Sequence, residues 1–132
     1  MCIRDNFKKH AVTRMGFTEL LRQARIFSFH VPLTQETRHM LNSRTIELMG
    51  TDSFVINASR GKVANENEVI HALENDLLAG AALDVFETEP LSKESRLRKL
   101  NHVILSPHVG AYTEEAYAKA SDQAVELAID FF

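Results

Sequence analysis

Ser53-Phe54-Val55-Ile56-Asn57 and Ala79-Gly80-Ala81-Ala82-Leu83-Asp84-Val85 are short apolar runs, and each is typical of a strand buried in a sheet. Between them, Asn65 and Glu68 form a capping-box-like pair, and we expect a helix from Asn65 to about Glu74. Two strands joined by a helix of this length form a parallel unit with a right-handed crossover. The sequence therefore predicts an α/β protein.

The flanking sequence repeats this alternation in both directions. Asn42 is positioned to cap a helix, and Gly50 stands where the end of a helix favours a positive φ. Pro32 and Pro107 each end an apolar run, as expected for strands. The further expected elements are helices over 17–24, 43–49 and 113–130 and strands over 26–31 and 102–106. The resulting order, α-β-α-β-α-β-β-α, predicts a doubly wound, Rossmann-like parallel sheet.

Length, charge and cysteine content narrow the classes of protein. A chain of 132 residues fits one domain, which we expect over residues 17–132, after an irregular basic segment at 1–16. The net charge of -3 gives no reason to expect nucleic acid or an anionic membrane as a partner. Cys2 is the only cysteine, so no intrachain disulfide can form, which fits a cytoplasmic protein. No apolar run is long enough for a membrane span, and the histidines show no metal-site grouping.

Short motifs follow each expected strand at its carboxyl end. These are Val31-Pro32 after the first strand, 58–61 after the second, Asp84 with Glu89-Pro90 after the third, and 107–111 after the fourth. In an open parallel sheet, ligands bind beyond the carboxyl ends of the strands. Although far apart in sequence, the four motifs are therefore expected to face one crevice.

Three residues in these motifs have the chemistry to act on a small acid. Arg60 can grip a carboxylate through two parallel hydrogen bonds and stays charged at any working pH. His108 can donate or remove a proton, as histidine does near neutral pH, and Glu89 beside it would orient the ring. Taken singly, each residue has a plainer interpretation: a surface salt bridge for Arg60, a structural histidine for His108, and a turn residue for Glu89.

The motifs read together resemble the D-isomer-specific 2-hydroxyacid dehydrogenase family, which includes phosphoglycerate dehydrogenase, glyoxylate/hydroxypyruvate reductases and D-lactate dehydrogenases. The resemblance covers about residues 17–131. It rests on His30-Val31-Pro32-Leu33-Thr34, Asn57-Ala58-Ser59-Arg60-Gly61, the stretch from Gly80 to Pro90, and Ser106-Pro107-His108-Val109-Gly110. One departure is Asp76, which stands where a glycine often ends the helix in the family.

The resemblance implies a role for each matching residue. Arg60 matches the substrate-binding arginine, His108 the catalytic histidine, and Glu89 its paired glutamate. Asp84 matches the acid that hydrogen-bonds the nicotinamide carboxamide. The cofactor-binding positions implied are Val31, Ala58, Ser59, Arg60, Asp84, His108, Gly110 and Ala111. The expected activity is hydride transfer between NAD(H) and the C2 of a small 2-hydroxy or 2-oxo acid, such as phosphoglycerate or hydroxypyruvate.

The family's phosphate-binding G-x-G-x-x-G turn is not found in the sequence. The five glycines stand at 16, 50, 61, 80 and 110, so no such turn can form. We therefore expect the chain to be the second half of a dinucleotide-binding domain, with most of the substrate domain also absent. The acidic residue that hydrogen-bonds the cofactor ribose would lie in the absent half, so NADP is not excluded as the cofactor.

Two consequences are expected from this reading. The absent first strand leaves an exposed sheet edge, which favours self-association or a complementary segment as a partner. Cofactor binding by the isolated chain is expected to be weak. The alternative function is that of an inactive truncated remnant or a protein-interaction module.

Overall fold

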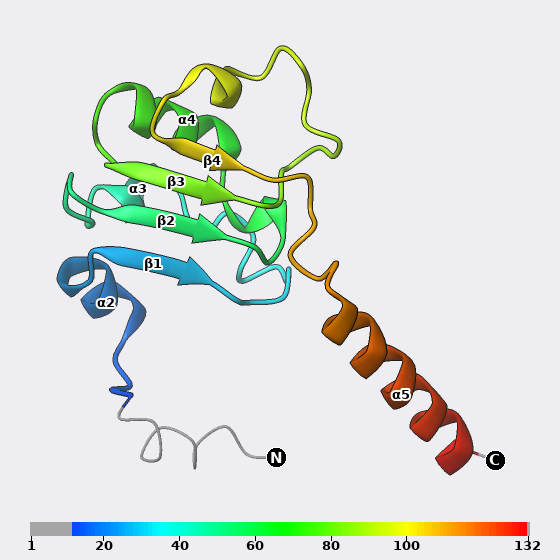
Figure 1. Cartoon of the computed structure of the whole chain (residues 1–132). Helices are drawn as coiled ribbons and strands as arrows, with labels where there is room; N and C mark the ends of the chain where they lie inside the picture. The colour runs from blue at the N-terminus through cyan, green and yellow to red at the C-terminus, as the bar shows by residue number, and fades with distance from the viewer. Residues whose placement is uncertain (1–11, 132) are drawn as a thin grey trace.

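Four parallel strands form the sheet at the centre of the computed structural model, which describes residues 12–131 (Figure 1). The strands are β1 (Ile26–Phe29), β2 (Phe54–Asn57), β3 (Gly80–Leu83) and β4 (Val103–Leu105), in the spatial order β1-β2-β3-β4. Each neighbouring pair is parallel, so the expected α/β, Rossmann-like class is confirmed. β1 occupies one edge of this sheet.

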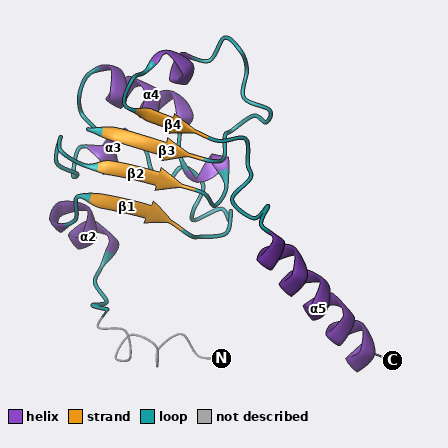
Figure 2. Ribbon diagram, viewed as in Figure 1, coloured by secondary structure: helices purple, strands orange, loops and turns teal. Residues whose placement is uncertain are grey.

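The helices follow the expected order, with two additions (Figure 2). They are α2 (Phe17–Gln23), α3 (Ser43–Ile46), α4 (Glu66–Glu74) and α5 (Glu114–Phe131), together with the 3-10 helices η2 (Gly61–Val63) and η3 (Arg96–Lys99). The sequence did not predict the 3-10 helices. The helix expected over 43–49 ends early, because the N–H groups of Leu48 and Met49 bond to carbonyls three residues back.

The expected basic segment at 1–16 falls largely outside the described residues. Residues 1–11, including Cys2, lie beyond the part of the chain that the structure describes. Residues 12–16 carry neither helix nor strand.

The expected caps begin α3 and α4, and one glutamate joins the two. Asn42 accepts from the Thr45 N–H at 3.1 Å, and the Thr45 hydroxyl accepts from the Asn42 N–H at 2.8 Å, which completes a capping box. Asn65 accepts from the Glu68 N–H at 3.3 Å and donates from its side-chain amide to Glu68 Oε1 at 3.0 Å. Glu68 Oε2 accepts from the backbone N–H of Ser43 at 2.5 Å, so a carboxylate of α4 also caps α3.

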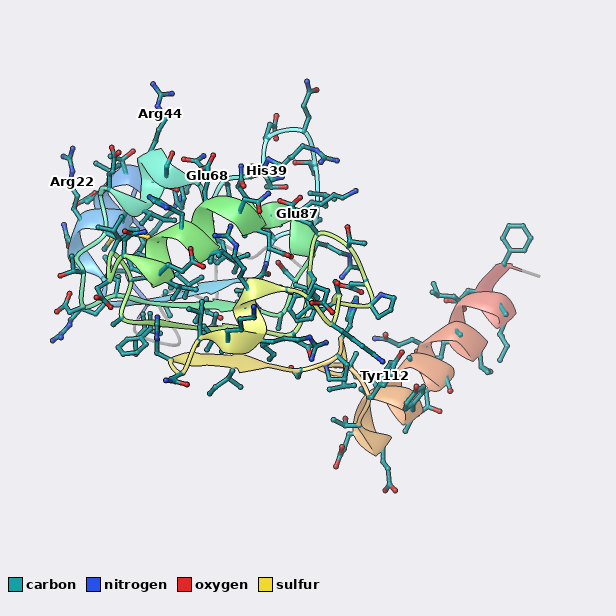
Figure 3. The ribbon with its side chains drawn as sticks, turned by 90° about the horizontal axis from the view of Figure 1, so that it is seen from above. Arg22, His39, Arg44, Glu68, Glu87 and Tyr112 are labelled. Carbon is teal, nitrogen blue, oxygen red and sulfur yellow. The ribbon has the colours of Figure 1, made fainter. Side chains whose placement is uncertain are left out.

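The hydrophobic core lies between one face of the sheet and the helices α3 and α4, which Figure 3 shows on the same side of the strands. Alternate strand residues point into this core, including Phe27, Phe29 and Val55. From the helix side, α4 buries Val69, Ile70, Ala72 and Leu73. The opposite residues of the strands remain exposed, since burial alternates along β1 and β2.

The parallel arrangement brings the carboxyl ends of all four strands to one edge of the sheet. The loops that follow β1, β2, β3 and β4 therefore begin at this edge, which is where the candidate residues lie. Beyond it, α5 projects away from the sheet and buries no residue (Figure 1). Over residues 12–131, no helix has both the length and the apolar character to cross a bilayer.

Candidate active site

Asn57 shapes the turn that carries Arg60. Its side chain is buried, and its Oδ1 accepts from the N–H and the hydroxyl of Ser59 at 3.1 and 2.9 Å. Its Nδ2 donates to the carbonyl oxygen of Arg60 at 3.1 Å. The turn leaves the Arg60 guanidinium exposed, with Nη1 donating to the Ser59 carbonyl oxygen at 2.6 Å. Sequence reasoning did not identify this positioning role of Asn57.

Four of the predicted cofactor positions line one cavity. It has a volume of about 280 Å³ and is lined by His30, Val31, Pro32, Ala58, Ser59 and Arg60. Val31 comes from the loop after β1, and Ala58, Ser59 and Arg60 come from the loop after β2. The expected convergence of these two loops is therefore seen in the structure.

Gly61 packs the loop after β2 against the loop after β3. A Cβ atom at position 61 would stand 1.8 Å from the carbonyl oxygen of Phe86 and 2.7 Å from the backbone nitrogen of Glu87. Only glycine tolerates so close an approach between two backbones. This contact sets Arg60, one residue earlier, beside the segment that leads to Glu89.

Glu89 and His108 form a hydrogen-bonded pair. His108 Nδ1 lies 2.7 Å from Glu89 Oε2, while Glu89 Oε1 accepts from the Phe86 N–H at 3.0 Å. The bond to His108, followed by that from Phe86, lowers the pKa of Glu89 below its ordinary value. A charged Glu89 favours the tautomer with hydrogen on Nδ1, which leaves Nε2 available for proton exchange.

Asp84 anchors the loop that carries His108. Its Oδ1 accepts from the Ser106 hydroxyl at 2.6 Å and the Val109 N–H at 2.9 Å, and its Oδ2 accepts from the Gly110 N–H at 2.8 Å. Burial of the carboxyl favours its neutral form, but these hydrogen bonds outweigh burial and lower the pKa of Asp84. The sequence had suggested a cofactor contact for Asp84, and the structure adds this anchoring role. One acceptor position remains on Oδ2.

The backbone of His108 has a φ of 55°, in the left-handed region that non-glycine residues rarely adopt. Asp84 bonds to Ser106 on one side of His108 and to Val109 and Gly110 on the other, and so holds this conformation in place. Strained backbone of this kind is often found at functional sites. Ala111 completes the turn, in which the Tyr112 N–H donates to the Val109 carbonyl oxygen at 2.8 Å.

A second cavity, of about 290 Å³, adjoins the Glu89–His108 pair. It is lined by Phe86, Glu89, Pro90, Leu91, Arg98, Leu105, Ser106, Pro107 and His108. Arg98, from η3, had not been singled out in the sequence. It donates to the carbonyl oxygens of Ser92 and Leu91 at 2.9 and 3.0 Å. Arg60 and the Glu89–His108 pair thus share one edge of the sheet but line different cavities.

The residues present fit one end of a dinucleotide. The cavity beside Arg60 and the Asp84-anchored turn offer apolar contact and hydrogen-bonding groups at the edge where nicotinamide would lie. No glycine-rich turn is available for a pyrophosphate. Among residues 12–131, no group of three or more histidine, cysteine, aspartate or glutamate side chains could hold a metal ion.

Several known proteins are similar to this chain in sequence or in fold. A glyoxylate reductase from Thermococcus litoralis is 47% identical over 102 residues, which cover 77% of this chain and 30% of that protein. A D-3-phosphoglycerate dehydrogenase from Synechocystis sp. is 42% identical over 107 residues, covering 81% and 19%. The crystal structure of D-lactate dehydrogenase from Aquifex aeolicus, complexed with NAD and lactic acid, superposes with a TM-score of 0.82 at 29% identity, covering 99% and 44%. The chain thus spans less than half of each relative.

A match to a family model shows which family the chain belongs to. Residues 3–110 match the model described as D-isomer specific 2-hydroxyacid dehydrogenase, NAD binding domain. This match covers most of the chain and includes Arg60, Asp84, Glu89 and His108. The chain therefore belongs to the D-isomer specific 2-hydroxyacid dehydrogenase family, and its sheet and helices form part of that family's NAD-binding domain.

Proposed function

We propose that this chain is the catalytic part of an NAD-dependent D-2-hydroxyacid dehydrogenase acting on a small acid such as phosphoglycerate or hydroxypyruvate. The observation that carries the proposal is the 2.7 Å contact between His108 Nδ1 and Glu89 Oε2, at the sheet edge that also carries Arg60. The relatives named glyoxylate reductase and D-3-phosphoglycerate dehydrogenase support this class of substrate. The single cysteine supports a cytoplasmic location, which belongs to the same proposal.

His108 is the proton donor and acceptor in this proposal. Glu89 holds the Nδ1 side of the ring, so Nε2 gives a proton to the carbonyl oxygen at C2 during reduction and removes it from the hydroxyl during oxidation. NAD(H), when bound, supplies or accepts the hydride at C2.

Arg60 holds the substrate carboxylate. Its guanidinium is exposed and donates to the Ser59 carbonyl oxygen, and it can exchange that bond for two bonds to a carboxylate. Val31, Ala58 and Ser59 would lie against the nicotinamide, with Asp84 and the turn at Gly110 and Ala111 beside it.

A complementary segment is part of the proposal, because a dinucleotide pyrophosphate needs a glycine-rich turn. The free edge of β1 is the place where a strand carrying that turn would pair. A groove of about 340 Å³ runs along this edge, lined by Phe17, Leu20, residues 26–31 and Met40. Its apolar lining suits the side chains of an added strand.

A chimera tests this function directly. This chain replaces the matching region of the Thermococcus litoralis glyoxylate reductase, whose remaining residues supply the rest of the enzyme. We expect NADH-dependent reduction of glyoxylate or hydroxypyruvate, and a kcat lowered roughly 10²–10⁴-fold by His108→Gln. Arg60→Lys should raise KM, whereas Arg25→Lys, in an exposed ion pair with Asp52, should leave KM unchanged. A folded chimera without turnover would contradict the proposal.

The alternative is a non-enzymatic remnant or interaction module, favoured by the missing glycine-rich turn. Calorimetric titration with NADH tests whether the isolated chain needs a complementary segment in order to bind the cofactor. We expect no binding in the micromolar range. Micromolar binding by the chain alone would show that no such segment is required.

A further inference from the structure

Two glutamates outside the candidate active site each accept a hydrogen bond from the other's backbone. Glu87 Oε1 accepts from the Glu66 N–H at 2.9 Å, and Glu66 Oε2 accepts from the Glu87 N–H at 3.1 Å. Glu66 is the first residue of α4, where the positive end of the helix dipole favours a carboxylate. This reciprocal pair, which we call the Glu66–Glu87 clamp, joins the start of α4 to the segment that leads from β3 to Glu89.

A third residue, His39, lies against the clamp from the loop after β1. Its Nε2 is 3.2 Å from Glu87 Oε1, which makes an ion pair when the ring is protonated, although Nε2 is shielded from solvent and makes no hydrogen bond (Figure 3). The His39 N–H donates to the Lys62 carbonyl oxygen in η2 at 2.9 Å. The loops after β1, β2 and β3 therefore meet at the clamp.

The clamp fixes a peptide group that the loops of the candidate site share. One N–H of the clamp belongs to the peptide between Phe86 and Glu87. The same peptide packs against Gly61, the residue after Arg60, since a Cβ there would stand 1.8 Å from its oxygen and 2.7 Å from its nitrogen. The Phe86 N–H, in turn, donates to Glu89 Oε1 at 3.0 Å. A displacement at the clamp therefore reaches both Arg60 and Glu89.

We propose that Glu87 is a positioning residue for the dehydrogenase reaction. Through the clamp it keeps the peptide between residues 86 and 87 in the orientation that holds Glu89 against His108. Glu87 acts through Glu89 rather than on the substrate. This role, which rests on the proposed function, makes the first turn of α4 a support of the catalytic pair.

The tautomer of His108 in the full chain tests this role without turnover. Glu89 Oε2 lies 2.7 Å from Nδ1, so the neutral ring should carry its hydrogen on Nδ1. Nitrogen-15 NMR of histidine-labelled chain at about pH 9, well above the ordinary titration range of histidine, measures the ratio of the two tautomers. The His108 signals are assigned from their loss in His108→Gln. A parent chain with the hydrogen on Nε2 would overturn both the proposed pairing with Glu89 and the role of Glu87.

Two substitutions separate the length of the Glu87 side chain from its charge. Glu87→Asp keeps the charge but is one methylene too short to reach the Glu66 N–H, and should lower the ratio of Nδ1–H to Nε2–H tautomers about 5-fold or more. Glu87→Gln keeps an acceptor oxygen at full length and should leave the ratio within about 2-fold of the parent. An unchanged ratio in Glu87→Asp, or an equal fall in Glu87→Gln, would overturn the role of the clamp.

Glu66→Ala provides a second variant in case Glu87→Asp does not fold. It removes the carboxylate that accepts from the Glu87 N–H, so the tautomer ratio should fall in the same direction. Circular dichroism establishes which variants are folded. A folded Glu66→Ala chain with the ratio of the parent would overturn the positioning role.

Glu74→Ala is the matched control. Glu74 is the last residue of α4, pairs with Arg96 at 2.8 Å, and has a side chain 32% exposed, close to the 30% of Glu87. Loss of this ion pair should leave the tautomer ratio unchanged, whatever it does to the free energy of unfolding. A fall as large as that in Glu87→Asp would show a general loss of stability and overturn the role of Glu87.

The chimera with the Thermococcus litoralis glyoxylate reductase measures the consequence for turnover. Glu87→Asp should lower kcat about 10-fold or more, because a small displacement of catalytic groups is costly, whereas Glu87→Gln and Glu74→Ala should retain the parent's kcat. An active chimera whose kcat does not respond to Glu87→Asp would overturn the positioning role and leave the proposed function intact. A folded chimera without turnover would overturn both.

Discussion

Asp84 Oδ2 accepts a hydrogen bond of 2.8 Å from the backbone N–H of Gly110, two residues beyond His108. The same buried carboxylate also accepts hydrogen bonds from Ser106 and Val109, so the Asp84 side chain supports the loop that carries His108. Asp84→Asn replaces one acceptor oxygen with an NH2 group. This group would then face one of the N–H or O–H donors that now bond to Asp84. We expect the free energy of unfolding to fall by about 1–3 kcal/mol, measured by urea denaturation. Asp122→Asn, at an exposed position on α5, should change it by less than about 0.5 kcal/mol, and equal effects would contradict the anchoring role.

Stability should also depend on pH through Asp84 and Glu89. Both have a pKa lowered by hydrogen bonds in the folded chain, so both bind protons more weakly than in the unfolded chain. The stabilisation is present above the ordinary carboxyl range of about 4 and is lost as the pH falls through the lowered values. Denaturation between pH 7 and pH 3 should show declining stability below about pH 5, with a shallower decline in Asp84→Asn. A stability that rises on acidification would contradict both assignments.

Gly61→Ala should destabilise the fold. The new Cβ would stand 1.8 Å from the Phe86 carbonyl oxygen, so the loops after β2 and β3 would have to separate. We expect a loss of about 1–3 kcal/mol in the free energy of unfolding, the usual cost of overpacking. Gly16→Ala is the matched control, because nothing lies within 4 Å of a Cβ there. If the two variants had equal stability, the close approach at Gly61 would be disproved.

Asp76→Gly should stabilise the chain. Asp76 follows α4 with a φ of 55°, and the Leu77 N–H donates to the Ala72 carbonyl oxygen at 2.8 Å, as in a Schellman motif. Glycine at this position relieves the left-handed strain and removes an acid from the negative end of the helix. We expect a gain of about 0.5–1 kcal/mol, measured as a higher Tm. Asp76→Ala removes the charge but keeps the Cβ, so an equal gain there would assign the effect to charge alone.

The sequence predicted the regular elements well, because the signals for them are local. Asn42 and Asn65 cap α3 and α4 as expected, and every expected strand is present. The expected strands were longer than the observed ones. The apolar runs that predicted them continue past the residues that pair with a neighbouring strand. The run from Ala79 to Val85, for example, contains a strand only over Gly80–Leu83. The left-handed φ at Asp76 is consistent with the glycine that the family often has there.

The geometry of the candidate site could be predicted only in part. Parallel strands require the four loops to share an edge, and this placed Arg60, Glu89 and His108 on it. The division into two cavities, the anchoring by Asp84 and the contact of Gly61 with Phe86 depend on the paths of the loops. These contacts join residues that are far apart in the sequence, and no local pattern signals them.

The Glu68 carboxylate caps α3 through Ser43 and also bonds to Asn65, the residue that caps α4. The positive ends of two helix dipoles therefore share a single counter-charge. Neither helix can fray at its first turn without disturbing the other, so opening of one promotes opening of both. Because α3 and α4 both pack on the core, we expect this side of the molecule to open as one cooperative unit.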